Sequence, residues 1–299
     1  MRGKRPTKTA ISFYILLAIV LILLVVGYLS KLHLSVLSPS GTVAQKERNL
    51  MFLALGLCAI VVVPVFSLAT LISLRYREGN KRPKKYSPDW DGSRALETTW
   101  WGVPFAIITI LAVVTWQSSY SLDPYKPLVA SQPPLNVQVV ALDWRWLFIY
   151  PEQKISTINW LEIPVNRPIS FHITSDSVMN SFWVPALGSQ IYAMPGMDTQ
   201  LNLMAFKTGD FHGSSANISG RGFSNMSFTT IAASQTNFDA WAKTIKNGGF
   251  NSLNKSTYQT LSRPSLDRSV RLFSVTDQNL YRSIINSYAA PGAEGGHHG

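Results

Sequence analysis

Cysteine is almost absent from this chain, because Cys58 is the single thiol in 299 residues. One thiol excludes an intrachain disulfide, and its place inside an apolar run is typical of a small buried hydrophobe. No cysteine lies near residues 27–30, so the first apolar run cannot be processed as a lipoprotein signal. The sequence also lacks a nucleophile–base constellation and a phosphate-binding glycine loop.

Acidic residues are scarce as well, with 16 Asp and Glu against 27 Lys and Arg, a net charge of +11. The excess belongs to residues 1–120, which hold 14 basic and 5 acidic residues, whereas residues 121–299 hold 13 and 11. The basic residues flank apolar runs and are not interleaved with aromatics on a soluble domain. This arrangement argues against nucleic-acid binding and is typical of membrane topology.

Three long runs without charge are present, at residues 10–29, 50–74 and 98–116. A helix of 20 residues is ~30 Å long and just spans a hydrocarbon core. Residues 1–30 are either a signal peptide or a retained signal-anchor helix. The run is longer than an ordinary signal core and has no clear cleavage site, which favours the anchor. The second and third runs predict a transmembrane hairpin over residues 50–120, with Pro64 kinking its first helix.

Charge predicts the orientation of these helices. Residues 75–85 carry six basic residues and one acid, and Arg2, Lys4, Arg5 and Lys8 precede the first run. Both clusters should be cytoplasmic. Three membrane crossings leave both clusters in the cytoplasm, and they place everything after residue 119 outside it. Buried helices of a soluble protein are the alternative, which three uncharged runs with this charge asymmetry disfavour.

The character of the chain changes at Asp123, where a proline-rich connector leads into short β-type runs broken by turn residues. The alternation predicts an all-β sandwich or barrel over residues 131–234. An aromatic-rich, helical C-terminal element should follow at 235–290, and then a glycine-rich disordered tail at 291–299. The predicted strands lie at 135–142, 144–150, 160–164, 169–174, 181–185, 199–205 and 226–232.

Several motifs stand in a fixed order in the β region. They are D-W-R-W at 143–146, S-F-W-V-P at 181–185, G-S-Q-I-Y-A-M-P-G-M at 188–197, and a loop at 211–226 with the spacing of a metal-binding loop. Together they resemble subunit II of the haem–copper respiratory oxidases, over residues 42–288. The resemblance implies a helical hairpin that carries a cupredoxin-like domain.

The loop at 211–226 departs from one branch of that family. In the cytochrome c oxidase branch, the fold holds the binuclear copper centre CuA through cysteine, histidine and methionine ligands, because copper needs soft thiolates and imidazoles. At the matching positions this chain has Asn180, Ser215, Ser219, Phe223 and Met226, with Asn217 where that branch has a glutamate. Only Met226 keeps a ligand type. We therefore expect no CuA site, and a packing role for the Met226 thioether.

The branch without this copper is that of the quinol oxidases, and the chain looks most like subunit II of the cytochrome bo-type ubiquinol oxidases. The resemblance implies a structural subunit of a proton-pumping quinol oxidase in the bacterial cytoplasmic (inner) membrane. It would be multi-pass, with its C-terminal domain on the periplasmic face. It would bind no cofactor itself, and haem and copper would belong to the catalytic subunit I. Its partners would be that subunit, the other subunits and membrane lipid, with quinol reached through the complex.

Two rival functions remain open from the sequence: a copper-carrying cytochrome c oxidase subunit II, and an anchored extracytoplasmic binding module unrelated to respiration. Glu97 has two interpretations as well. It is a first-turn carboxylate favoured by the helix dipole, or, as the family implies, a residue at the mouth of a proton-uptake pathway. Trp144 and Trp146 should serve core packing or contact with the catalytic subunit. His172 and His212 lack a second ligand at metal-binding spacing.

Overall fold

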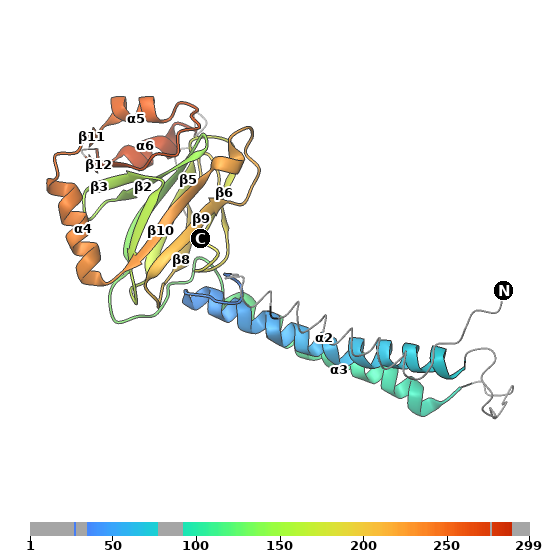
Figure 1. The fold of residues 1–299 in the computed structure, drawn as a ribbon. Coiled ribbons are helices and arrows are strands. Elements are labelled where there is room, and N and C mark those ends of the chain that lie inside the picture. Colours follow the sequence, from blue (N-terminus) through green and yellow to red (C-terminus); the bar gives the residue numbers. More distant parts are fainter. Residues whose placement is uncertain (1–26, 28–34, 77–91, 276, 289–299) are drawn as a thin grey trace.

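The computed structural model describes residues 27, 35–76, 92–275 and 277–288. The expected anchor over residues 1–30 and the tail at 291–299 lie outside the described residues, apart from Gly27, as does most of the basic loop at 75–85. The rest forms a long helical hairpin joined to a two-sheet β domain, with three short helices on that domain (Figure 1).

The hairpin consists of α2 (Thr42–Arg75) and α3 (Arg94–Ser121), which run side by side away from the β domain (Figure 1). Both are long and apolar enough to cross a membrane. Helix α2 begins eight residues before the uncharged run at Leu50, because the polar segment 42–49 continues the helix up to the β domain. Cys58, expected to be buried, lies exposed on α2 in the single chain.

Several hydroxyl groups on the apolar part of the hairpin are satisfied within their own helix. Thr70 Oγ1 donates to the Phe66 carbonyl at 2.8 Å, and Thr109 Oγ1 donates to the Phe105 carbonyl at 2.9 Å. A hydroxyl bonded one turn back presents little polarity to a hydrocarbon solvent. These residues are therefore compatible with a helix that faces lipid or another apolar helix.

The β domain is a sandwich of two sheets. The large sheet has the order β11-β12-β3-β2-β1-β5-β8, and the small sheet has the order β4-β10-β9-β6-β7. The strands of the large sheet are β11 (Ser252–Leu253), β12 (Arg271–Val275), β3 (Ile155–Ile158), β2 (Arg145–Tyr150), β1 (Leu135–Leu142), β5 (Ile169–Ser175) and β8 (Thr199–Leu203). Those of the small sheet are β4 (Trp160–Pro164), β10 (Ser227–Ala233), β9 (Gly209–Ser215), β6 (Asn180–Trp183) and β7 (Ile191–Ala193).

Strand β2 of the large sheet is buried on both faces, which explains why it shows no polar alternation from Trp146 to Tyr150. Trp146, Phe148 and Tyr150 point into the core between the sheets. Leu147 and Ile149, at the intervening positions, point into a second apolar cluster on the opposite face. Since successive side chains of a strand face opposite ways, a strand covered on both sides can be apolar at consecutive positions.

The C-terminal element supplies the cover for that second face. Its helices are α4 (Gln235–Asn247), α5 (Lys255–Leu261) and α6 (Leu280–Asn286). Leu280, Tyr281 and Ile284 of α6 join Tyr258 and Leu261 of α5 in the second cluster. The predicted helices are present, and strands β11 and β12, which the sequence did not reveal, extend the large sheet beside β3.

The start of α2 is built into the β domain. The backbone N–H groups of Ser40 and Gly41 donate to the Ala186 carbonyl at 2.8 and 2.9 Å, and Gly41 forms a β-bridge with Ala205. A side chain at position 41 would place its Cβ 2.3 Å from the Leu187 carbonyl oxygen. Only glycine permits this approach, so the hairpin is attached to the sandwich by backbone contacts.

Candidate functional site

The candidate site is the loop that joins β9 to β10. Strand β9 extends to Ser215, so the first part of the stretch 211–226 is strand and the loop is shorter than the sequence predicts. The Ser215 N–H donates to the Met226 carbonyl at 3.1 Å and closes the loop at its base. Between them lies the single-turn 3₁₀ helix η1 (Phe223–Asn225), and the Met226 N–H donates to the Phe223 carbonyl at 2.9 Å.

Four of the five positions that match the CuA ligands come together at this loop, namely Asn180, Ser215, Ser219 and Met226. The Ser215 hydroxyl lies 3.2 Å from Asn180 Oδ1, although Asn180 comes from strand β6. The Ser219 hydroxyl contacts the Met226 sulfur at 3.8 Å. All four of these side chains are buried. Phe223 is half-buried and forms no side-chain hydrogen bond to the others.

The polar atoms of this cluster are satisfied by one another and by the backbone. Asn180 Nδ2 donates to the Val178 carbonyl at 2.8 Å, and the Ser215 hydroxyl accepts from the Ser181 N–H at 3.4 Å. Asn217 Nδ2 donates to the Met179 carbonyl at 3.0 Å and ties the loop to the turn before β6. Hydroxyl and amide groups are poor ligands for a soft copper centre. Among the described residues, His, Cys, Asp and Glu side chains do not gather in threes that could hold a metal ion.

The two tryptophans of the D-W-R-W motif have different environments. Trp146 is fully buried, with its ring centroid 5.5 Å from that of Phe182 and 5.8 Å from that of Phe228. Trp144 sits in the β1–β2 turn with φ = 63° and lies against the loop. Its indole Nε1 donates to the Ser219 carbonyl at 3.1 Å, and a Cβ at Gly222 would lie 2.2 Å from its ring. Trp144 therefore packs on the loop, and Trp146 belongs to the core.

Two family models match the chain. The one described as "Cytochrome C oxidase subunit II, periplasmic domain" covers residues 151–233, and the one described as "COX Aromatic Rich Motif" covers residues 249–292. Ubiquinol oxidase subunit 2 of Acetobacter aceti is 48% identical over 258 residues, which are 86% of this chain and 83% of the relative. The chain belongs to the quinol oxidase subunit II family.

Other relatives carry the same description. Cytochrome bo(3) ubiquinol oxidase subunit 2 of Pseudomonas putida is 43% identical over 87% of this chain and 82% of its own length. Quinol oxidase subunit 2 of Bacillus subtilis is 37% identical over 85% of this chain and 79% of its own length. The expected family and its cupredoxin-like fold are thus confirmed.

A second polar cluster in this quinol oxidase subunit II joins the C-terminal element to the sandwich. The Tyr258 and Tyr288 hydroxyls both donate to the Asp176 carboxylate, at 2.5 and 3.0 Å, and the Tyr281 hydroxyl donates to Asp198 at 2.8 Å. Burial, together with the nearby Asp176 carboxylate, raises the pKa of Tyr258 far above its usual value, so it stays a donor. The sequence offered one signal for this cluster, namely aspartates at the edges of predicted strands, Asp176 shortly after 169–174 and Asp198 directly before 199–205, and tyrosines in the aromatic-rich element.

His172 belongs to the same cluster. Its Nδ1 lies 3.2 Å from Asp198 Oδ2, and this hydrogen bond raises the pKa of the imidazole above its usual value. His172 and Tyr281 therefore share one carboxylate, which links strand β5 to helix α6. His212 lies exposed on β9.

Glu97 lies in the first turn of α3, at the end of the hairpin that points away from the β domain (Figure 1). Its backbone N–H donates to the Ser93 carbonyl at 2.9 Å, and its side chain is exposed. Among the described residues it forms no ion pair. This position suits either a carboxylate that stabilises the helix N-terminus or one that meets another subunit.

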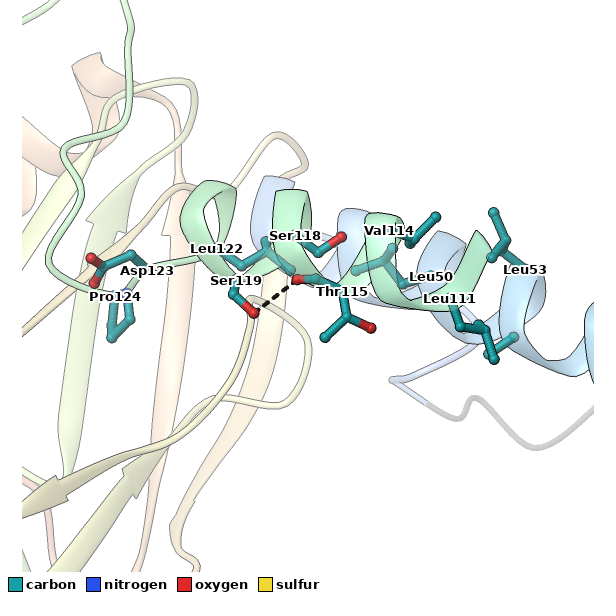
Figure 2. Close-up of a pocket in the computed structure, with 11 residues that line it drawn as sticks. Leu50, Leu53, Leu111, Val114, Thr115, Ser118, Ser119, Leu122, Asp123 and Pro124 are labelled. Carbon is teal, nitrogen blue, oxygen red and sulfur yellow. Dashed lines mark hydrogen bonds between the residues drawn. The ribbon is translucent and has the colours of Figure 1, made fainter. Parts of the chain in front are cut away.

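A groove of about 650 Å³ lies between α2 and α3 beside the β domain. Figure 2 shows Leu50 and Leu53 on one wall, Leu111 and Val114 on the other, and Asp123 at the mouth. The Ser119 hydroxyl donates to the Thr115 carbonyl at 2.8 Å and is satisfied within its own helix. The groove thus presents a mainly apolar surface, with its polar side chains at the end near the β domain.

Proposed function

We propose that this quinol oxidase subunit II serves as a structural subunit that holds no redox centre. Electrons from quinol would then reach oxygen within the catalytic subunit, which would carry the haem and the copper, and reduction to water would be coupled to proton pumping. The observation that carries the proposal is the loop around Ser215, where four of the five family ligand positions have non-ligand side chains. Three of these are polar, and they form hydrogen bonds in place of metal bonds.

The chain would span the bacterial inner membrane more than once, with the β domain on the periplasmic face. Two apolar helices and the periplasmic family model support this placement. The basic residues between α2 and α3 favour a cytoplasmic position for that connection. The alternative of an anchored module unrelated to respiration has no support among these relatives. They are named as oxidase subunits, and they match this chain over most of their length.

Subunit I would dock on the hairpin and on the surface around the loop. Val178, Met179 and Ile218 form an exposed apolar surface there, with Ile218 80% exposed, and the Asn217–Met179 hydrogen bond holds its two halves together. Exposed apolar patches of this kind mark contact sites on soluble domains.

Purification of the complex through a tag on this chain tests the proposal. We expect a haem-bearing membrane subunit to co-purify, quinol oxidase activity, and a copper content accounted for by the catalytic subunit. A near-infrared band or a copper EPR signal from this chain would favour the cytochrome c oxidase reading. Recovery of the chain without any haem protein would favour the unrelated binding module.

Glu97 would take up protons from the cytoplasm for the catalytic subunit. Its exposed carboxylate, at the end of the hairpin far from the β domain, supports this role, and ionisable residues near a membrane are often part of proton paths. We expect Glu97→Gln to lower turnover and proton pumping in the assembled complex, and Glu97→Asp to restore most of both. Arg94→Gln, one turn away on the same helix, is the matched control. Unchanged pumping in Glu97→Gln would leave only the helix-dipole role.

A further inference from the structure

A second groove lies at the junction between the hairpin and the sandwich. It has a volume of about 640 Å³ and is separate from the groove between the helices. Glu47, Arg48 and Met51 of α2 form one wall, and Trp183 and Gln190 of the small-sheet region form the other. Because the start of α2 is fixed by its backbone bonds to Ala186 and Leu187, this groove is a built feature of the fold.

Arg48 is incompletely paired within the described part of the chain. Its guanidinium nitrogens make two long contacts, to the Leu37 carbonyl at 3.3 Å and to Asn49 Oδ1 at 3.5 Å. Its Nε is buried without a hydrogen-bond partner, and it forms no ion pair with a described carboxylate. A guanidinium held in this way is suited to bind a carboxylate or a phosphate.

Glu47 lines the same groove and carries the opposite charge. It accepts a hydrogen bond from the exposed Ser189 hydroxyl and has no cationic partner among the described residues. The groove thus offers a cation and an anion at neighbouring positions, each unpaired by the other. A ligand that carries both charges a few ångströms apart would match this arrangement.

The groove lies at the depth of lipid headgroups if the hairpin spans the membrane. Arg48 precedes the first residue of the uncharged run by two positions, which is ~3 Å along a helix. Met51, inside that run, forms the membrane side of the groove. Trp183 is half-buried with its indole N–H donating to the Gly188 carbonyl at 3.1 Å, and tryptophan is typical of this interface.

We propose that this groove binds the headgroup of a phosphoethanolamine-type glycerophospholipid from the outer leaflet. The phosphate would bind the Arg48 guanidinium, the ammonium group would face Glu47, and an acyl chain would leave along Met51. An acidic loop of a partner subunit would satisfy Arg48 alone, whereas the zwitterion satisfies both charges. The inference rests on the proposed membrane placement of the hairpin.

Native mass spectrometry of the tagged complex tests this site. The complex is exchanged into nanodiscs that contain isotope-labelled phosphatidylethanolamine, and retained lipid is counted after release. We expect the complex to retain labelled lipid, and Arg48→Gln to lower its affinity for one such lipid by about tenfold or more, since a hydrogen bond to a charged group is lost. Lys46→Gln, which removes an exposed cation of the same helix outside the groove, should retain the lipid.

Glu47→Gln provides an independent readout, because it keeps the acceptor for Ser189 and removes only the charge. It should reduce the preference for phosphatidylethanolamine over phosphatidylglycerol. No retained lipid in the unmodified complex, equal retention in Arg48→Gln, or release of the haem-bearing subunit by Arg48→Gln with lipid unchanged would each overturn the lipid site. Failure of the proposed function has a different signature, since no haem protein would then accompany even the unmodified chain.

Discussion

The packing of Trp144 on Gly222 yields a sharp steric prediction. A Cβ at position 222 would lie 2.2, 2.3 and 2.6 Å from three ring carbons of Trp144. The indole cannot easily retreat, because Trp144 occupies a left-handed turn at φ = 63° and donates to the Ser219 carbonyl. Overpacking costs about 1–3 kcal/mol, and a lost indole hydrogen bond adds about 1 kcal/mol. We therefore expect Gly222→Ala to destabilise the β domain by about 2–4 kcal/mol.

The measurement is thermal unfolding of the full chain in detergent, followed by tryptophan fluorescence. For a domain of this size, that loss should lower Tm by about 5–15 °C. A double-mutant cycle isolates the cause, because Trp144→Ala removes the ring that the new methyl group meets. In the Trp144→Ala background, Gly222→Ala should have little further effect. An unchanged Tm in the single variant, or strict additivity in the cycle, would refute the proposed contact.

Three further predictions concern the polar clusters. The pKa of His172 is raised by its hydrogen bond to Asp198. The stabilisation from this hydrogen bond is therefore complete below the unfolded pKa of 6.5 and is lost as pH rises through the higher folded pKa. His172→Gln should flatten this pH dependence of Tm, by a small amount because both partners are partly exposed. Tyr258→Phe removes the donor to Asp176, weakens the C-terminal element by about 1–3 kcal/mol, and should speed amide exchange in α5, whereas Tyr120→Phe in α3 should not. The fourfold variant Asn180→His, Ser215→Cys, Ser219→Cys, Phe223→His should bind copper with visible absorbance through its thiolates, whereas the twofold variant Asn180→His, Phe223→His, which keeps both serines and offers no thiolate, should not. A colourless fourfold variant that is folded would show that the four positions do not converge on one metal ion.

Much of the fold follows from patterns in the sequence, and the misses have physical causes. The strands at 135–142 and 160–164 were predicted with the bounds that the structure shows, because apolar residues and flanking turns mark both. Strand β9 was missed because its sequence, GDFHGSS, contains two glycines, which disfavour strands. Gly213 is nevertheless suited to its place, since a Cβ there would lie 2.2 Å from the Phe228 ring.

Other misses come from contacts between distant residues. Strands β11 and β12 are short and pair with each other, and β12 also pairs with β3. In that pairing Arg271 lies opposite Ile158, which is more than 100 residues earlier in the chain. The polar start of α2 lies outside the hairpin predicted at 50–120 because its residues lack the apolar signal of a membrane helix, while backbone bonds that order it come from Ala186 and Leu187. No local pattern contains this information.

The candidate site was predictable in its positions and not in its contacts. The resemblance named Asn180 and Ser215 as matching positions, but only the pairing of β6 with β9 brings these side chains within 3.2 Å. For the same reason, the sequence does not show which tyrosine of the C-terminal element pairs with which aspartate. Each pair joins residues at least 82 positions apart, as with Tyr258 and Asp176.

The shape of the loop depends on how its buried polar groups are satisfied. A metal centre can hold a loop closed through its bonds to the ligands, and this chain has no such ligand set at the matching positions. Here the Ser215 hydroxyl lies within reach of Asn180, Asn217 and the Ser181 N–H, while the Trp144 indole holds the Ser219 carbonyl. A buried polar group without a partner costs about 1–3 kcal/mol, so each of these bonds favours the closed form. The same backbone shape can therefore persist without metal, and an intact loop is by itself no sign that electrons pass through it.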